Sequence, residues 1–435
     1  MSVITYERDP DLQIPRRERK SHLARLDWIL LLAALALSCL GVALVWSATL
    51  KTDDGMSGRR QAISLVVALA LAYLISRANT RWLRRFAIPA YVLALIGLLA
   101  TFTPLGVEVA GARAWVQLPG GFTLQPSEFA KVALILTIGA ILSSSGREYG
   151  DRPGFWPVAL SIAVALPPAG IVILQSDTGS AMVMGCVLAV MLLVAGTSWF
   201  ILLPIALIIG GGVYYVLTND VLPDYQMARL TAFMNPEADP LGAGHNTLQS
   251  RIAIGAGGMS GQGLGQGMQT QGGFVPVNES DFIYTVAVEE LGFIGGVVLI
   301  FLLCVILLRG VQIAFRSKRV FSRCVAGGIV AWFAFQGFES IGMALGITPV
   351  TGVTLPFVSY GGTSMIATWL AVGILQAIRI SERRERLQGE QRTDAPEPDP
   401  RPPDQDAATA ALPRQADAPD LETAQPVAPA GEPQS

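Results

Sequence analysis

The sequence predicts an all-α polytopic membrane protein. Of its 435 residues, 51% are hydrophobic and only 15% are charged, and the mean hydropathy is +0.48. Soluble globular chains carry roughly 25% charged residues. Many apolar runs reach about 17 residues or more, the length of helix needed to cross a hydrocarbon core about 30 Å thick. The pattern excludes a soluble multidomain enzyme, and it excludes a β-barrel, whose strands alternate in shorter segments.

The apolar runs predict ten transmembrane helices. They cover residues 28–47, 62–75, 86–103, 127–142, 157–174, 178–195, 200–217, 283–308, 325–347 and 364–380. Cytoplasmic loops of membrane proteins carry an excess of Lys and Arg. With the N-terminus in the cytoplasm, 24 of the 31 Lys and Arg residues fall on the inside. Both termini are therefore predicted to be cytoplasmic.

Three parts follow from this topology. Residues 1–27 form a basic cytoplasmic segment, residues 28–380 the transmembrane domain, and residues 381–435 a cytoplasmic tail. Ten prolines stand between Pro396 and Pro433, with many alanines and more acids than bases. Such a composition cannot bury enough apolar surface to fold, so the tail is predicted to be disordered.

A large extracytoplasmic loop, residues 218–282, is predicted between the seventh and eighth helices. Loops longer than about 15 residues are usually functional or disordered, and this composition favours function. Its glycine-rich run, 255–273, has no Gly-x-Gly-x-x-Gly spacing and no Walker lysine, which excludes a nucleotide-binding loop. We interpret it as a flexible loop or as backbone that a substrate approaches closely.

Asp281 stands where this loop meets the eighth helix. A carboxylate at a membrane mouth beside apolar residues can act as a general base. The alternative is a helix-start residue, since Ser280 and Asp281 both suit a helix N-terminus, where the helix dipole favours the ionised carboxylate. The sequence leaves both interpretations open.

Glu128 and Lys131 lie three residues apart at the start of the fourth helix, a spacing that brings side chains together on one helix face. Charges at such a depth pair with each other or line a hydrated cavity. Outward-side cations could hold a diphosphate, because a guanidinium binds phosphate oxygens in bidentate fashion. The candidates are Arg60, Arg113, Lys131, Arg229 and Arg251.

Other polar residues have less specific interpretations. Asp177, in the tight turn between the fifth and sixth helices, suits a turn or a cap. Glu289, Glu290 and Glu339 lie inside apolar spans and must find partners, with a proton or ion relay as the functional alternative. The four cysteines have no C-x-x-C spacing and there are only two histidines, so no metal site built from protein ligands is expected.

Four motifs make the chain resemble the SEDS (shape, elongation, division and sporulation) family of bacterial cell-wall synthesis. They are LQPSEFAK at 124–131, NPEADPLGAG at 235–244, SDFI at 280–283 followed by EELG at 289–292, and PVTGVTLPFVSYGG at 349–362. The resemblance covers about residues 28–380. The second motif and QSRIAIG at 249–255 are more similar to the elongation branch, RodA, than to the division branch, FtsW.

The resemblance implies a peptidoglycan glycosyltransferase of the bacterial cytoplasmic membrane that polymerises lipid II into β-1,4-linked glycan strands. It places the essential carboxylate at Asp281 and the paired charges of a central cavity at Glu128 and Lys131, with Arg60 and Asp177 lining that cavity. The last motif adds Ser359 and Tyr360 to the candidate substrate-binding residues.

The implied partners are a class B penicillin-binding protein and the elongation complex, without nucleic acid. No covalently bound cofactor is implied. A divalent cation, Mg²⁺ or Mn²⁺, could assist and would be held mainly by the substrate diphosphate.

Two other functions fit the same pattern. A lipid II flippase would rely on charges deep in the bundle more than on Asp281, and a non-catalytic scaffold for a transpeptidase would need no outer carboxylate at all. Within the glycosyltransferase interpretation, a role in division is the alternative to elongation.

Overall fold

The computed structural model describes residues 22–109, 112–117, 123–144, 152–219, 227, 231, 233–234 and 244–393. The predictions for Arg229, for the motif at 235–240 and for the tail beyond residue 393 lie outside the described residues, as does most of the N-terminal segment.

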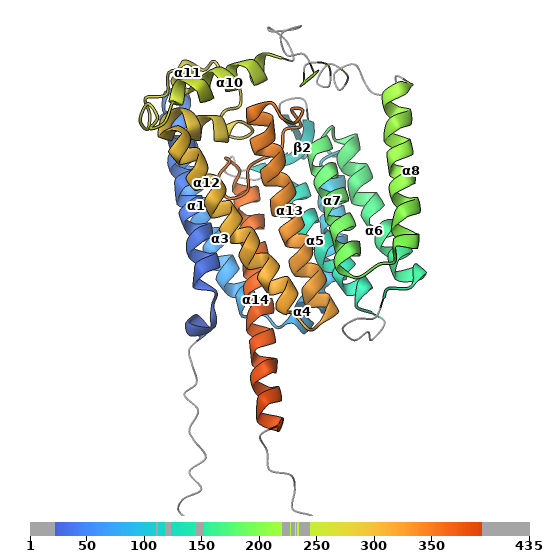
Figure 1. Ribbon diagram of the computed structural model, residues 1–435. Coiled ribbons are helices and arrows are strands. Elements are labelled where there is room, and N and C mark those ends of the chain that lie inside the picture. The colour runs from blue at the N-terminus through green and yellow to red at the C-terminus, as the bar shows by residue number, and fades with distance from the viewer. Residues whose placement is uncertain are drawn as a thin grey trace, which may run out of the picture. The chain divides into compact units, whose positions relative to one another are not determined.

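Long helices packed side by side make up most of the described chain (Figure 1). Each predicted span falls on one of them: α1 (Trp28–Ala48), α3 (Met56–Ser76), α4 (Thr80–Ala100), α5 (Pro126–Leu142), α6 (Phe155–Leu174), α7 (Thr178–Val194), α8 (Trp199–Thr218), α12 (Ile283–Arg316), α13 (Val320–Leu345) and α14 (Gly362–Thr393). Shorter helices are η1 (His22–Arg25), α2 (Leu50–Asp53), α10 (His245–Gly257) and α11 (Met268–Gly272).

Seven helices of the described chain are long and apolar enough to cross a membrane, namely α1, α3, α4, α6, α12, α13 and α14. Two shorter apolar helices are α7 and the stretch Trp199–Ile208 of α8. The fold is that of a polytopic helical membrane protein. The count of ten crossings stays a prediction, because α5 and α7, with 17 residues each, are at the short limit for a span.

Short polar side chains fix where several helices begin. The Asp27 carboxylate accepts the Leu30 N–H at 3.3 Å, and the Asp177 carboxylate accepts the Ser180 N–H at 3.0 Å. Such side chains are preferred N-caps because they satisfy an N–H group that has no partner inside the helix. The interpretation of Asp177 as a cap residue is confirmed.

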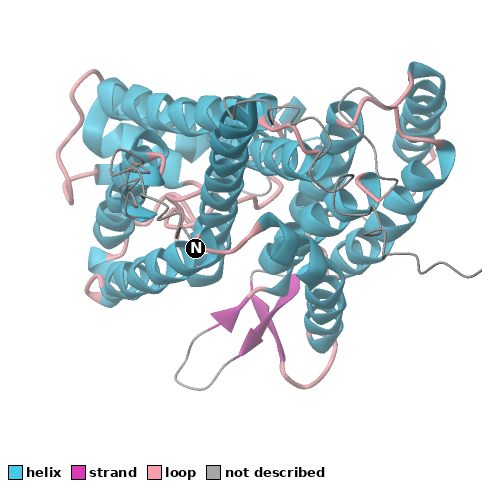
Figure 2. Cartoon of the chain, turned by 90° about the horizontal axis from the view of Figure 1, so that it is seen from below, coloured by secondary structure: helices cyan, strands magenta, loops and turns pink. Residues whose placement is uncertain are grey.

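The all-α prediction is wrong between α4 and α5, where the chain forms a small antiparallel sheet. Its strands are β1 (Gly106–Val109), β2 (Ala112–Gln117) and β3 (Thr123–Leu124), in the order β1-β2-β3. Gly106 pairs with Val116, and Val116 pairs with Leu124. The strands stand beside the helix ends (Figure 2). Six residues at most per strand are too few for alternation to stand out among long apolar runs.

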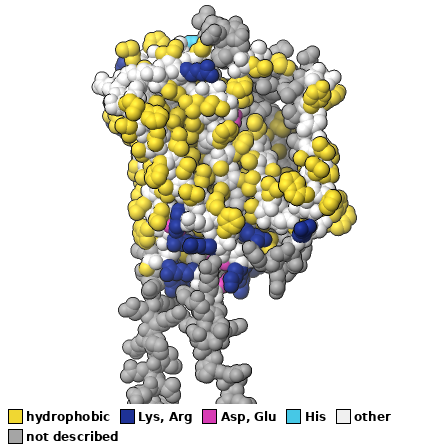
Figure 3. All heavy atoms as spheres, in the orientation of Figure 1, with side chains coloured by type: hydrophobic (Ala, Val, Ile, Leu, Met, Phe, Trp, Pro, Cys, Tyr) yellow, Lys and Arg dark blue, Asp and Glu magenta, His cyan; other side chains and the backbone are white. Residues whose placement is uncertain are grey.

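Helices α13 and α14 form the interior of the bundle. Within their most apolar windows, 72% and 83% of residues are buried, against at most 44% in the other five candidate spans. α13 contacts α5, α7 and α12, and α1 contacts α3 and α12. The outer helices present apolar side chains over a broad band, with Lys and Arg gathered along its lower rim (Figure 3). This distribution suits a helix bundle surrounded by lipid.

The glycine-rich run is packed closely against the start of α12. The N–H groups of Gln262 and Gly263 donate to the carbonyls of Glu289 and Glu290 at 3.0 and 2.9 Å. A Cβ on Gly257 would lie 2.0 Å from the Val288 carbonyl oxygen, and one on Gly261 would lie 2.2 Å from that of Glu290. The prediction of a flexible loop is therefore wrong here: glycine is needed because two backbones touch.

A matched pair of glycines in α10 tests this contact. Gly257→Ala should destabilise the protein by about 1–3 kcal/mol, because the added methyl group has no space. At Gly255, two residues earlier in the same helix, an added methyl group would meet no other atom within 4 Å. Gly255→Ala should raise stability by about 0.5–1 kcal/mol through helix propensity. Thermal unfolding of the two purified variants measures both, and equal effects would contradict the close approach.

Candidate active site

Asp281 lies in a half-buried turn immediately before α12. The N–H groups of Ser280 and Asp281 both donate to the Val277 carbonyl, at 3.3 and 3.1 Å, and the Ser280 hydroxyl donates to Asp281 Oδ1 at 2.8 Å. Phe282 occupies the N-cap position of α12, which has no side-chain cap. The alternative interpretation, in which Asp281 is the N-cap of this helix, is therefore wrong, because Phe282 holds that position.

A non-helical segment, residues 349–361, fastens this turn from the other side. The Ser359 hydroxyl donates to the Ser280 carbonyl at 2.5 Å and accepts the Leu355 N–H at 2.7 Å. The Tyr360 N–H donates to the Glu279 carbonyl at 2.8 Å. A Cβ on Gly352 would lie 3.5 Å from Asp281 Oδ2, so the segment also passes directly beside the carboxylate.

Gln61 of α3 completes this support. Its side-chain amide donates to the Ser359 carbonyl at 2.9 Å and accepts the Gly361 N–H at 3.2 Å, and the residue is fully buried. Buried backbone groups need such partners, because an unpaired one costs about 1–3 kcal/mol. Gln61 therefore holds the chain on both sides of Tyr360.

A cleft of about 220 Å³ adjoins the Asp281 turn. Its lining comes from α3, the sheet, the 277–280 turn and the start of α14: Arg60, Ser64, Trp115, Thr123, Val277, Glu279, Ser280, Tyr360, Gly361 and Gly362. The structure thus brings Arg60 and Tyr360, both predicted site residues, to one cleft. Arg60 is exposed there, and a guanidinium in that position can receive an anionic group.

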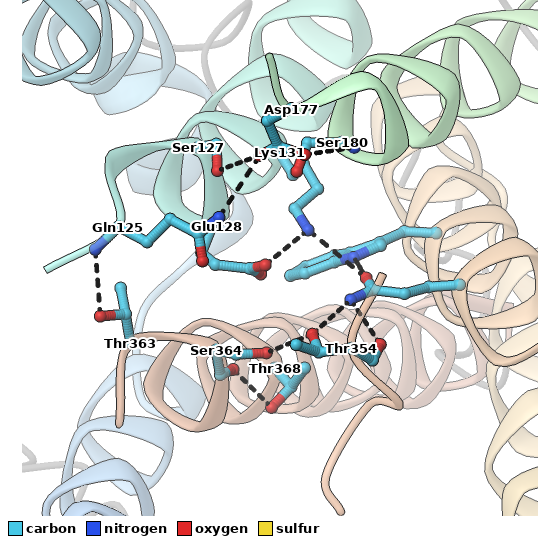
Figure 4. A network of polar contacts seen from close by, with 12 residues as sticks. Gln125, Ser127, Glu128, Lys131, Asp177, Ser180, Thr354, Thr363, Ser364 and Thr368 are labelled. Carbon is cyan, nitrogen blue, oxygen red and sulfur yellow. Dashed lines mark hydrogen bonds and ion pairs between the residues drawn. The ribbon is translucent and has the colours of Figure 1, made fainter. Parts of the chain in front are cut away.

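Glu128 and Lys131 form a buried ion pair of 2.8 Å, with side chains only 3% and 1% exposed. Lys131 Nζ also lies 3.4 Å from Gln336 Oε1 and 5.1 Å from the centre of the Trp332 ring (Figure 4). The Trp332 indole N–H donates to the same Gln336 oxygen. Glu128 Oε2 is buried without a hydrogen-bond partner among the described residues.

Asp177 joins this network at the start of α5. Its Oδ2 lies 3.3 Å from the Gln125 amide nitrogen and 3.5 Å from the Ser127 hydroxyl (Figure 4). Three of the residues predicted to line one cavity, Glu128, Lys131 and Asp177, therefore lie close to one another. Arg60 lies in the cleft instead.

One segment connects the network to the Asp281 turn. The Gln336 amide donates to the carbonyl and the hydroxyl of Thr354 at 2.8 and 3.0 Å. Thr354 belongs to the same non-helical stretch whose Gly352 and Ser359 contact the Asp281 turn. The position of the outer carboxylate is thus tied to the buried ion pair through a few hydrogen bonds.

Two other predicted cations that the structure describes, Arg251 and Arg113, do not line the cleft. The Arg251 guanidinium donates to the carbonyls of Leu345 and Gly346 at 3.3 and 3.2 Å, so it caps the C-terminus of α13. Arg113 is exposed on β2 and donates to the Thr103 carbonyl at 3.2 Å. Neither arginine lies in the cleft with Arg60, and their role in holding a diphosphate stays a prediction.

The three intramembrane acids have found structural partners. Glu289 accepts the N–H groups of Gln269 and Thr270 at 2.6 and 2.9 Å. Glu290 accepts the Ser47 hydroxyl at 2.6 Å, and Glu339 accepts the Thr351 hydroxyl at 3.0 Å. Each carboxylate holds another segment of the chain, namely α11, α1 or the 349–361 segment, which favours structure over the ion relay considered from the sequence. Within the described residues no group of three His, Cys, Asp or Glu side chains could hold a metal ion.

Sequence reasoning missed Gln61, Trp115, Trp332 and Gln336. Gln336 carries a signal that could have been used, because an amide in the middle of an apolar helix must face a polar partner. Trp115 belongs to the sheet that was not predicted.

Fold and site together define a polytopic helical membrane protein with a buried ion pair and a half-buried carboxylate beside a cleft. The family model FtsW/RodA/SpoVE, described as cell cycle protein, matches residues 27–384. The chain therefore belongs to the FtsW/RodA/SpoVE family, which is the SEDS family indicated by its motifs.

Named relatives and solved structures agree with this membership. The chain is 38% identical to a probable peptidoglycan glycosyltransferase FtsW of Geobacter metallireducens, over 81% of this chain and 94% of the relative. It is 34% identical to the peptidoglycan glycosyltransferase MrdB of Escherichia coli, over 81% and 93%.

Among solved structures, a chain of a peptidoglycan synthase complex that coordinates polymerization and crosslinking gives a TM-score of 0.69 at 31% identity, covering 83% of this chain and 99% of that one. RodA of Thermus thermophilus gives 0.59 at 29% identity, covering 81% and 96%.

Proposed function

We propose that this chain polymerises lipid II into β-1,4-linked glycan strands, with Asp281 as the general base. The chain is a peptidoglycan glycosyltransferase, the activity that its relatives from Geobacter metallireducens and Escherichia coli carry in their names. The observation that supports the mechanism is the half-buried Asp281 carboxylate in a turn fastened by Ser359, beside a cleft that contains Arg60.

The chemistry of the transfer fits this geometry. The donor sugar leaves an α-diphosphate and the product is β-linked, so the anomeric carbon inverts. One base must accept the proton of the acceptor hydroxyl, and positive charge must stabilise the departing diphosphate. Asp281 suits the first role and Arg60 the second. A Mg²⁺ or Mn²⁺ ion, if the reaction uses one, would be held by the diphosphate oxygens, which are the hard ligands it prefers.

The buried Glu128–Lys131 pair has a different part in the proposal. Lys131 is almost fully buried against Glu128, Gln336 and Trp332. We propose that the network keeps the 349–361 segment in place beside the Asp281 turn. Asp177 positions the starts of α5 and α7.

The proposal includes a topology and a partner. Ten crossings with both termini in the cytoplasm of a bacterium would place Asp281 and the cleft on the outer side of the cytoplasmic membrane, where lipid-linked sugars are polymerised. Lys and Arg along one rim support this orientation (Figure 3). The likeness to a chain of a synthase complex with crosslinking activity supports a class B penicillin-binding protein as partner.

The cellular role that we propose is elongation, based on the motif at 235–240. A role in division is the second candidate, and it is favoured by the 38% identity to FtsW compared with 34% to MrdB. Depletion of the protein in its own host separates them, since loss of an elongation enzyme gives rounded cells and loss of a division enzyme gives filaments.

The deciding experiment is glycan polymerisation from lipid II by the purified protein, alone and with its transpeptidase. Polymer in either condition supports the proposal. Transfer of lipid II across vesicle membranes without polymer formation would favour a flippase. If the protein neither polymerises nor transfers lipid II but increases crosslinking by the transpeptidase, a scaffold would be favoured.

The tail should be dispensable for this reaction. A chain ending at Arg392 should polymerise lipid II within about twofold of the full chain, because a Pro- and Ala-rich segment cannot fold against the bundle and would lie across the membrane from Asp281. The measurement is the polymerisation rate of both purified forms at equal thermal stability. A large loss in a stable truncated protein would contradict this expectation.

A further inference from the structure

The far end of α12 from Asp281 carries a second polar pocket, of about 350 Å³. It lies among α1, α12 and α14. Four arginines line it, against two carboxylates: Arg309, Arg316, Arg379 and Arg383 with Asp27 and Glu382. The proposed glycosyl transfer uses none of these residues, so the pocket needs its own explanation.

The pocket lining carries a net positive charge, because it contains four guanidinium groups and only two carboxylates. Asp27 is buried, and its Oδ2 accepts Arg309 Nε at 3.0 Å and Nη2 at 2.6 Å. Arg379 Nη1 lies 2.8 Å from the same oxygen but makes no aligned hydrogen bond to it. One carboxylate thus serves two guanidiniums. Glu382 accepts the backbone N–H of Lys318 at 3.2 Å.

An anion with several oxygens is the ligand that this arrangement fits. Guanidinium groups bind phosphate oxygens in bidentate fashion. Arg379 and Arg309 share one carboxylate, and each guanidinium carries five N–H donors, so donors remain for a further anion. Arg316 and Arg383 are exposed at the pocket and accessible to such a ligand. A zwitterionic headgroup would place its ammonium among the arginines, which is unfavourable.

Apolar side chains adjoin the pocket residues in sequence. Trp28, next to Asp27, is 50% exposed, and Phe315, next to Arg316, is 80% exposed. Tryptophan is typical of the boundary between lipid headgroups and acyl chains. Lys and Arg gather at this rim of the apolar band (Figure 3). A headgroup in the pocket would therefore lie at the boundary between this rim and the apolar band, where the acyl chains of a lipid begin.

We propose that this pocket binds the phosphodiester headgroup of an anionic phospholipid from the adjacent leaflet. Pockets of basic residues between membrane helices are known to hold such headgroups. A lipid bound by Arg309 of α12 and Arg379 of α14 would add a further anionic link between these two helices beside the carboxylate of Asp27.

Native mass spectrometry of the full-length protein in detergent tests the proposal, with phosphatidylglycerol and phosphatidylcholine as probes. Wild type should retain phosphatidylglycerol in preference. The R316Q/R383Q variant should bind it about 30-fold more weakly, since each basic residue near an anionic lipid contributes about a fivefold factor. The matched control is R81Q/R85Q, which removes two exposed arginines of α4. The start of α4 lies at the same end of the bundle as the pocket, because Arg319, three residues after Arg316, lies 3.5 Å from Thr80.

If the pocket variant and the control retain phosphatidylglycerol equally, the proposal is overturned, because any arginine at this rim would then bind the lipid as well as the pocket arginines do. Inorganic phosphate is the second arm. If it raises the thermal unfolding temperature of wild type as much as phosphatidylglycerol does, the site takes soluble phosphate and the lipid assignment is wrong. Should the double variant fail to fold, R383Q alone, at an exposed position, should still weaken lipid retention about fivefold.

Discussion

Replacing Asp281 with asparagine should remove most of the polymerisation activity, by a factor of about 10² to 10⁴, the usual contribution of a general base. Asparagine has nearly the same shape and can still accept the hydrogen bond from the Ser280 hydroxyl, but it cannot take up a proton. The backbone of the turn is held by hydrogen bonds of Val277, Ser359 and Tyr360, which the substitution leaves in place. Folding and partner binding should therefore persist.

The measurement is glycan-strand formation from lipid II by purified Asp281→Asn and wild type, with thermal unfolding beside it. Glu108→Gln is a matched control, because it also neutralises one carboxylate, exposed on β1, and it should leave the rate unchanged. Near-normal polymerisation by Asp281→Asn would remove Asp281 from the mechanism and direct attention to Glu279, which lines the cleft. Equal loss of stability and activity would instead assign Asp281 a structural role.

Lys131→Met should cost about 3–5 kcal/mol of stability, because it leaves the buried Glu128 carboxylate without a counter-charge. Both side chains are nearly inaccessible to solvent, at 1% and 3% exposure, so water cannot compensate. The exposed pair of Arg319 and Glu385, at 39% and 38% exposure, is the control. Glu385→Gln should cost less than about 1 kcal/mol.

The double variant Glu128→Gln, Lys131→Met separates structure from function. It should regain most of the lost stability, because neither buried charge remains. Polymerisation should stay about 10- to 100-fold below wild type, because the Lys131–Gln336 contact that supports the 349–361 segment is lost and a misplacement of about 1 Å near a reacting group can cost about 10²-fold. Thermal unfolding and polymerisation of the four proteins complete the cycle. Recovery of both properties together would show that the pair is only structural.

Local pattern was sufficient for some features of this protein. The ten apolar runs each became one helix, because a long apolar run has few alternatives to a helix in a lipid environment. Asp177 could be recognised as a cap from its place in a tight turn. The pairing of Glu128 with Lys131 followed from their spacing of three residues.

Other features depended on contacts between residues far apart in the chain. Gln61 is 298 positions from Ser359, to which it donates, and no pattern in either segment announces that bond. The glycine-rich run appeared flexible because composition does not reveal the backbone of α12 against which it packs. Arg251 appeared free to bind phosphate because the C-terminus of α13, which it caps, is 94 residues away.

The sequence by itself determined the class of protein and the positions of its helices, and it made Asp281 a candidate, because hydrophobicity, helical spacing and short motifs are local properties. Only the tertiary structure decided which cation lines the cleft beside the Asp281 turn, which buried acids are structural, and that segment 349–361 joins this turn to the ion pair. Those outcomes depend on how helices distant in sequence pack together, and packing is set by shape and by the satisfaction of buried polar groups over the whole bundle.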